Sequence, residues 1–226
     1  MELVIRGKTK DVFQLADGNY LLQFKDDLTG TDGTFDPGAD SVGLTVKGAG
    51  RAALRLSKYF FTLLAEKEIP THYIEADLDQ LTMTVKRAVP FGHGLEVICR
   101  YRAVGSFYRR YGKYIKEGEP LNAFVEFTLK DDEREDPPIT EEALQMLGIL
   151  SFAEYRLLTD LTRRISGIVR EELARKDIEL CDIKLEFGRL ETGQIILIDE
   201  ISGGNLRAVR RGESVDPLAL ADLICR

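Results

Sequence analysis

The sequence predicts an α+β protein of two lobes, built from antiparallel sheets and helices. Short β-prone runs divided by turn residues fill the first third of the chain, which indicates an antiparallel sheet. Apolar residues at helical spacing come next, and further strand and helix patterns follow. With 226 residues, 44% of them hydrophobic, the chain is long enough for one large domain or two lobes. We expect an N-terminal lobe of residues 1–90 and a larger α+β lobe of residues 91–226.

The N-terminal lobe begins with three short predicted strands, over residues 2–6, 11–15 and 20–25. Asp17-Gly18-Asn19 has the composition of a turn between the second and the third. A glycine-rich stretch then runs from residue 26 to 50. It is too long for a simple connection in a compact domain, so we expect a functional loop there. Residues 51–68 have a helical pattern, which Ile69-Pro70 ends.

Strands and helices are also predicted after residue 70. The strand patterns cover residues 71–75, 81–87, 96–102, 123–130, 179–187 and 194–200, and the last two form a hairpin. The helical patterns cover residues 140–147, 151–176 and 216–225. Ser151 with Glu154 has the form of a capping box, which predicts the start of the longest helix.

Composition excludes several classes of protein. The net charge of −7 argues against a general nucleic-acid binder, although a local basic pocket for a phosphorylated ligand is compatible with it. No segment approaches the roughly 18 to 20 apolar residues that cross a bilayer, and the N-terminus lacks the order of a signal peptide. Three widely spaced cysteines, Cys99, Cys181 and Cys225, fit a reducing cytoplasm. With only His72 and His93 present, a multi-histidine metal site is excluded.

One predicted strand carries charged residues at alternate positions. Because side chains alternate along a strand, Asp182, Lys184 and Glu186 point to one side while the apolar residues between them point into a core. A tight hairpin turn would set Glu186 opposite Asp199, and neighbouring carboxylates repel unless a cation lies between them. Magnesium with nucleotide phosphates suits such an oxygen site, and Lys184 would reach a phosphate oxygen. Spacing alone leaves open a solvated strand face with alternating charges.

Two further segments have the composition of phosphate sites. Lys8 and Lys10, in Gly7-Lys8-Thr9-Lys10, fit a nucleotide phosphate lying under a hairpin, but the segment lacks the earlier glycine of a phosphate-cradling loop. Arg100 lies near the end of a strand, and Gly105-Ser106 opens a helical turn after it. Arginine, a serine hydroxyl and free backbone N–H groups together suit a phosphate monoester. An exposed basic turn and a surface basic patch are the respective alternatives.

Taken together and in order, these segments resemble the SAICAR synthetase (phosphoribosylaminoimidazole-succinocarboxamide synthase) family along nearly the whole chain. The segments that carry the resemblance are Gly7-Lys8-Thr9-Lys10, Phe24-Lys25-Asp26-Asp27, Lys47-Gly48, Glu96-Val97-Ile98-Cys99-Arg100, Gly105-Ser106, Glu126-Phe127 with Lys130-Asp131-Asp132 and Asp136-Pro137, residues 182–188, and Asp199-Glu200-Ile201-Ser202 with Arg207.

The resemblance implies a two-lobed ATP-binding fold with a layout like that of protein kinases and ATP-grasp enzymes. It implies a ligase of de novo purine biosynthesis that joins L-aspartate to the carboxylate of carboxyaminoimidazole ribonucleotide, giving SAICAR, ADP and phosphate. The implied cofactors are ATP and Mg²⁺, the partners are these small molecules, and the chain would assemble as a homo-oligomer in the cytoplasm. Transfer of the γ-phosphoryl group would turn the poor acyl donor into an acyl phosphate, which the aspartate amine attacks.

The resemblance also implies roles for individual residues. Lys8 and Lys10 would contact the ATP phosphates, and Glu186 and Asp199 would bind magnesium and, through it, ATP. Asp182 and Lys184 would form a catalytic pair at the reacting carboxylate. The 5′-phosphate of the ribonucleotide would be bound by Arg100, Ser106 and Arg207. Asp32 would lie near substrate and metal.

The chain departs from the family pattern in four places: residues 49–53, the insertion 91–94, residues 203–207 and the tail 208–226. The first and third are loops that would recognise the imidazole and the amino acid. A related ATP-dependent amide ligase or small-molecule kinase with another acceptor is therefore the alternative hypothesis. A nucleotide-binding regulator without catalysis is a third hypothesis. It is disfavoured because a pure binder has little need of all four residues Asp182, Lys184, Glu186 and Asp199.

Overall fold

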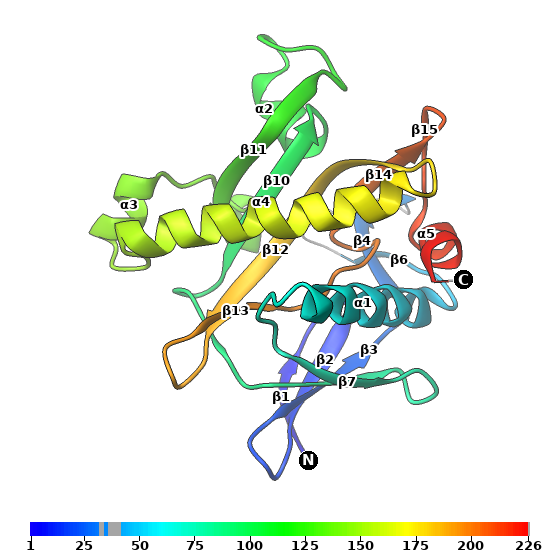
Figure 1. Ribbon diagram of the computed structural model, residues 1–226, viewed down its shortest axis with the longest axis vertical. Helices are drawn as coiled ribbons and strands as arrows, with labels where there is room; N and C mark the ends of the chain where they lie inside the picture. The colour runs from blue at the N-terminus through cyan, green and yellow to red at the C-terminus, as the bar shows by residue number, and fades with distance from the viewer. Residues whose placement is uncertain (32–33, 36–41, 226) are drawn as a thin grey trace. The chain divides into compact units, whose positions relative to one another are not determined.

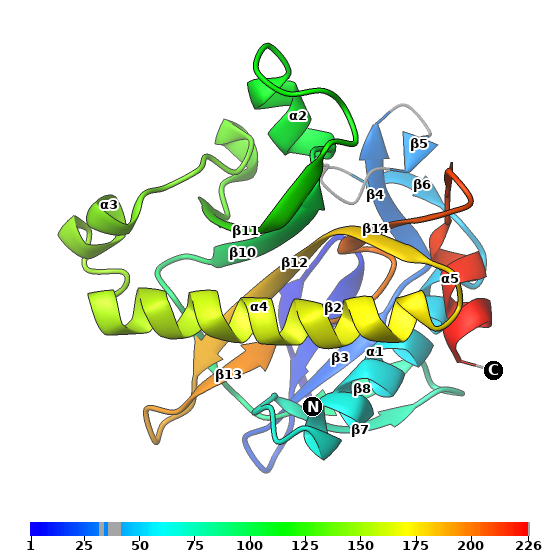
Figure 2. The ribbon, with the colours of Figure 1, turned by 45° about the horizontal axis from the view of Figure 1, so that its top comes forward.

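The computed structural model describes residues 1–31, 34–35 and 42–225, which form two compact units (Figures 1 and 2). The first unit comprises Met1–Val89, Arg189–Asn205 and Val215–Arg226, and the second comprises Pro90–Gly188 and Leu206–Ser214. The sequence predicted a single division near residue 90. The chain does leave the first unit there, but it returns at Arg189, leaves again at Leu206 and returns at Val215.

The first unit contains a five-stranded antiparallel sheet of order β1-β2-β3-β8-β7. Its strands are β1 (Glu2–Arg6), β2 (Lys10–Gln14), β3 (Tyr20–Phe24), β7 (Tyr73–Asp77) and β8 (Thr82–Val85). The predicted turn between β2 and β3 is confirmed, since the Asp17 carboxylate accepts from the backbone N–H of Asn19 at 3.0 Å. The predicted strands 2–6, 11–15 and 20–25 match the observed ones to within one residue at each end.

Helix α1 (Ala49–Glu66; Figure 1) packs against β3 and β7 and supplies much of the apolar core of this unit. Its buried face includes Leu54, Phe60, Phe61 and Leu64, all fully inaccessible to solvent. The Asp26 carboxylate accepts from the N–H of Gly50 at 3.0 Å and so satisfies one donor of the first turn. Helix α5 (Pro217–Ile224) packs against α1 and begins at the capping residue Asp216.

The glycine-rich stretch was expected to be a loop, but much of its described part is a small sheet. Strand β4 (Asp27–Thr31) pairs with β5 (Thr34–Phe35) and with β6 (Val42–Thr45). A Cβ on Gly43 would lie 2.6 Å from the Cα of Gly30, so these glycines allow β4 and β6 to approach closely. At Gly30 and Gly43, glycine therefore serves close contact between strands.

The second unit is built on an antiparallel sheet of order β11-β10-β12-β14-β15. Its strands are β10 (Leu95–Arg102), β11 (Pro120–Leu129), β12 (Glu179–Arg189), β14 (Leu206–Arg210) and β15 (Glu213–Ser214). The short strands β9 (Val89–Pro90) and β13 (Ile195–Ile198) complete the strands of the chain that the structure describes. The sequence did not predict β14, which brings Arg207 opposite Asp182.

The long helix α4 (Phe152–Ala174) packs on β10 and β11 and closes the core of the second unit (Figure 2). Its predicted capping box is confirmed, because Ser151 Oγ accepts from the Glu154 N–H and the Glu154 carboxylate accepts from the Ser151 N–H. The remaining helices are α2 (Gly105–Tyr111), η1 (Asp132–Arg134) and α3 (Glu141–Met146). No helix among the described residues combines the length and the apolar character that a membrane crossing requires.

Candidate functional site

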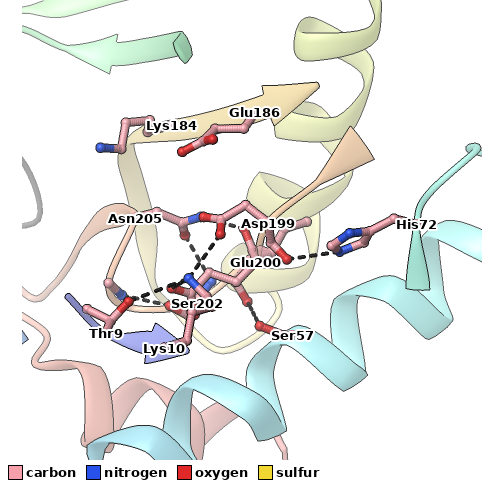
Figure 3. Close-up of polar contacts among 12 residues, drawn as sticks. Thr9, Lys10, Ser57, His72, Lys184, Glu186, Asp199, Glu200, Ser202 and Asn205 are labelled. Atoms are coloured by element: carbon pink, nitrogen blue, oxygen red, sulfur yellow. Dashed lines mark hydrogen bonds and ion pairs between the residues drawn. The ribbon is translucent and has the colours of Figure 1, made fainter. Parts of the chain in front are cut away.

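In the first unit, a lysine on β2 lies against two acidic residues that follow β13 (Figure 3). Lys10 Nζ is 2.9 Å from Asp199 Oδ1 and 2.9 Å from Glu200 Oε1. The side chains of Lys10 and Glu200 are 11% and 7% exposed, whereas that of Asp199 is 31% exposed. The buried ammonium therefore faces a buried carboxylate and a carboxylate that solvent reaches.

The two carboxylates keep this lysine charged. Burial by itself would lower the pKa of Lys10, but attraction to Asp199 and Glu200 outweighs it and raises that pKa above its ordinary value. Lys10 is therefore a fixed cation at physiological pH. A lysine beside carboxylates that can hold a metal ion is a recurring combination in sites of phosphoryl transfer.

Glu200 is a site residue to which the sequence pattern assigns no role. Its Oε1 binds Lys10, but its Oε2 is buried and has no hydrogen-bond partner among the described residues. A buried carboxylate oxygen without a partner calls for a water or a cation. The only signal in the sequence was its place beside Asp199 in the Asp-Glu-Ile-Ser segment.

The acidic groups of the first unit fit a hard cation. Carboxylate oxygens of Asp199 and Glu200 are ligands of the type that Mg²⁺ prefers, and Mg²⁺ usually needs only one or two of them because nucleotide phosphates supply the rest. Within the described residues, no cluster of three or more His, Cys, Asp or Glu side chains forms a metal site made by protein alone. These two carboxylates by themselves would leave most coordination positions of a bound Mg²⁺ to other ligands.

In the second unit, strand β12 shows the predicted alternation. Ile183, Leu185 and Phe187 are buried in the core, at 2% exposure or less. Lys184 and Glu186 lie on the other side of the strand and are partly exposed. Alternation along the strand thus puts Lys184 and Glu186 on the side away from the core. Asp182, which the sequence groups with them, is buried at 3% exposure.

Lys184 and Glu186 each already have a partner. Lys184 Nζ donates to Glu96 Oε1 at 2.6 Å, and the Thr128 hydroxyl donates to the same carboxylate at 3.0 Å. Lys130 Nζ donates to Glu186 Oε1 at 2.7 Å. Burial would lower the pKa of Lys184, but Glu96 holds it above its ordinary value. No sequence pattern assigns a role to these neighbours, although Glu96 and Lys130 belong to segments that carry the resemblance.

Arg100 is the centre of a buried charge network. The residue is 1% exposed, and its Nε donates to Glu126 at 2.7 Å while Nη1 donates to Asp182 at 2.8 Å. Its Nη2 donates to Ser106 Oγ at 2.8 Å. Arg207 Nη1 donates to the same Asp182 at 2.9 Å. Asp182 therefore holds two of the three residues expected at the 5′-phosphate, and Arg100 holds the third.

The predicted residues are thus distributed over both units. Lys8, Lys10 and Asp199 belong to the first unit, as does Glu200. Asp32 lies outside the residues that the structure describes. The predicted residues of the second unit form the two groups just described: Lys184 and Glu186, and Arg100, Ser106, Asp182 and Arg207. The expected adjacency of Glu186 and Asp199, which belong to different units, stays a prediction.

Comparisons with known proteins agree on one family. The family model for SAICAR synthetase matches residues 3–216. The phosphoribosylaminoimidazole-succinocarboxamide synthase of Clostridium tetani is 68% identical over 225 residues, which is 99% of each chain.

Solved structures give the same result. A SAICAR synthetase solved in complex with ADP superposes with a TM-score of 0.84 at 33% identity, covering 96% of this chain and 93% of the other. The Ehrlichia chaffeensis phosphoribosylaminoimidazole-succinocarboxamide synthase also gives 0.84, at 27% identity, covering 95% of this chain and 89% of its own. The α+β architecture with antiparallel sheets is shared with these structures, and the chain belongs to the SAICAR synthetase family.

Proposed function

We propose that this chain joins L-aspartate to carboxyaminoimidazole ribonucleotide at the expense of ATP, giving SAICAR, ADP and phosphate. Membership of the family makes the chain an ATP-dependent ligase of purine biosynthesis. At the level of residues, the observation that carries the proposal is the Lys10 ammonium, held 2.9 Å from both Asp199 and Glu200. Together these three side chains place a positive charge beside carboxylate oxygens, and Mg-ATP requires both.

In this proposal, Lys8 and Lys10 bind nucleotide phosphates. Asp199 in the first unit and Glu186 in the second are proposed as magnesium ligands. Magnesium would supply charge neutralisation on the phosphates when it is bound. Because Asp199 is already paired with Lys10, a cation that binds its carboxylate competes with that ammonium, while Glu200 keeps its own hydrogen bond to Lys10.

The ribonucleotide phosphate is proposed to bind at Ser106 and Arg207, with Arg100 behind them. Ser106 Oγ already accepts from Arg100, so the hydroxyl hydrogen of Ser106 can be donated to a phosphate oxygen. Arg100 is too deeply buried, at 1% exposure, to act as a mobile grip. It would act by fixing the serine and by its positive charge. Asp32 stays a proposed neighbour of substrate and metal.

Asp182 and Lys184 are proposed to lie at the carboxylate that reacts. ATP would phosphorylate that carboxylate, and the amine of L-aspartate would then displace phosphate from the acyl phosphate. The chain's contribution is positioning and charge neutralisation, because phosphoryl transfer needs little covalent help from the protein. Cys99 and Cys181 are buried, and burial raises the pKa of both thiols, so neither is poised as a nucleophile.

The test is an ADP-release assay with carboxyaminoimidazole ribonucleotide, Mg-ATP and L-aspartate, combined with mass detection of SAICAR. We expect ADP and SAICAR in equal amounts only when all three substrates are present. ADP without SAICAR, at a rate that aspartate does not change, would instead identify a small-molecule kinase. Nucleotide binding without any ADP release would reject catalysis. The homo-oligomeric state and the cytoplasmic location are further proposals, which sedimentation and cell fractionation test.

A further inference from the structure

The backbone of residues 199–202 is held by side chains instead of by a neighbouring strand. Strand β13 ends at Ile198 and β14 begins at Leu206. Three consecutive carbonyl groups between them each accept a hydrogen bond from a side chain (Figure 3). The pairs are His72 Nε2 with Asp199 O at 3.0 Å, Asn205 Nδ2 with Glu200 O, and Ser57 Oγ with Ile201 O at 3.3 Å.

The three donors are themselves fixed. Ser57 is fully buried on α1, and His72 and Asn205 are 4% and 7% exposed. Asn205 also accepts from the N–H of Ser202 at 2.9 Å, so its amide group binds the segment at two points. A buried polar side chain with satisfied hydrogen bonds is rigid, and it transmits that rigidity to the backbone that it binds.

His72 has the most specific place of the three. Its backbone N–H donates to Leu197 O at 2.9 Å, and its ring packs edge-on against Phe61 with centroids 5.5 Å apart. A carbonyl oxygen only accepts, so Nε2 must carry the hydrogen in its bond to Asp199. The ring therefore reaches the backbone of the one acidic residue in this segment that stays open to solvent.

The Asp199 backbone needs such support. Its φ of 68° lies in the left-handed region, which costs a residue other than glycine about 1 kcal/mol or more. If Asp199 relaxed to a negative φ, its Cα–Cβ bond would point in another direction. Its carboxylate would then move away from Lys10. The hydrogen bond from His72 to the carbonyl of Asp199 opposes that relaxation.

We propose that His72 is a positioning residue, which with Ser57 and Asn205 fixes residues 199–202 so that the Asp199 carboxylate is aimed for the magnesium nucleotide. This inference rests on the proposed role of Asp199. It assigns no contact between His72 and any substrate. It predicts that loss of the Nε2 donor acts through metal and nucleotide binding at Asp199, even where the fold is retained.

The test compares His72→Leu, which removes the donor at similar volume, with His72→Gln, whose amide nitrogen can take the place of Nε2. Calorimetry of ADP binding is run with Mg²⁺ and with a chelator, alongside turnover. We expect His72→Leu to lose most of the gain in ADP affinity that Mg²⁺ gives, and to lower kcat/KM about 10- to 100-fold, as loss of a residue that supports a metal ligand does. His72→Gln should recover most of both.

Two controls separate the possible failures. Ile224→Ala removes buried apolar volume near the end of α5 and none of the three donors to residues 199–201, so it should leave the Mg²⁺-dependent gain intact. If it loses that gain as fully as His72→Leu, or if His72→Gln is as impaired as His72→Leu, the positioning role is wrong. Asp199→Asn tests the premise: normal turnover in that variant would reject the proposed role of Asp199. An inactive Asp199→Asn beside a normal His72→Leu would reject the inference alone.

Discussion

The guanidinium group of Arg207 lies against the backbone of Gly105. A Cβ placed on Gly105 would come within 2.7 Å of Arg207 Cζ and within 2.9 Å of both terminal nitrogens. Gly105 also has a φ of 56°, which other residues adopt only with strain. Glycine at position 105 therefore leaves room for the Arg207 guanidinium and also permits the turn into α2. The proposed phosphate site depends on the absence of a Cβ at this position.

Gly105→Ala should displace Arg207 and raise KM for the ribonucleotide about 10-fold or more, because a side chain shifted by an ångström loses much of its contribution to positioning. KM for ATP should change little. Gly212→Ala is the matched control, since Gly212 has a φ of 86° in the same unit and an added Cβ there meets nothing within 4 Å. Equal effects of the two substitutions on KM would show that backbone strain, and not Arg207, is responsible.

Lys10→Met should leave the Asp199 and Glu200 carboxylates without their shared ammonium. We expect the melting temperature to fall, because Glu200 is buried and an uncompensated buried charge is costly. Mg²⁺ should then raise the melting temperature of Lys10→Met by more than it raises that of the unsubstituted chain, since the metal replaces a lost cation. The double variant Lys10→Met with Glu200→Gln should recover part of the stability. A melting temperature of Lys10→Met that is insensitive to Mg²⁺ would contradict cation binding at these carboxylates.

Asp182→Asn should reduce stability as well as activity. Asp182 and Arg100 are 3% and 1% exposed, so weakening their ion pair should cost about 3 kcal/mol in the free energy of unfolding. Glu186→Gln is the comparison. Its partner Lys130 is 47% exposed, and solvent screening limits such a pair to about 1 kcal/mol or less. Urea unfolding measures both costs, and an Asp182→Asn variant as stable as Glu186→Gln would refute the structural role.

The pH dependence of stability should carry a contribution from His72. Burial lowers its pKa to about 4 from an ordinary value of 6.5. Between those values the unfolded chain binds a proton that the folded chain does not, so stability is lost as pH falls from 6.5 toward 4. The full shift corresponds to roughly 3 kcal/mol. Urea unfolding of His72→Gln at several pH values should show a shallower decline over this window than the unsubstituted chain. Parallel curves would mean that His72 does not titrate there.

The elements that the sequence predicted well are those with a local signal. Helix α4 has a capping box at Ser151 and an apolar stripe, and the prediction of residues 151–176 is close to Phe152–Ala174. Strand β14 was missed because it is short and carries charged residues, Arg207 and Arg210, and it becomes a strand by pairing with β12. Strands β4 and β6 were missed because their glycines resemble a loop until the close contact of Gly30 with Gly43 is seen.

The features of the candidate site also fall into those with a local sequence signal and those that depend on tertiary contacts. The sequence by itself determined the family and the charged face of β12, because alternation along one strand is a local property of neighbouring residues. Only the tertiary structure decided the partners. Arg100 meets Asp182 across 82 positions, His72 meets Asp199 across 127, and Lys10 meets Glu200 across 190. Such contacts arise when burial forces each polar group to find a hydrogen bond or an opposite charge, and the folded chain alone fixes which groups are within reach.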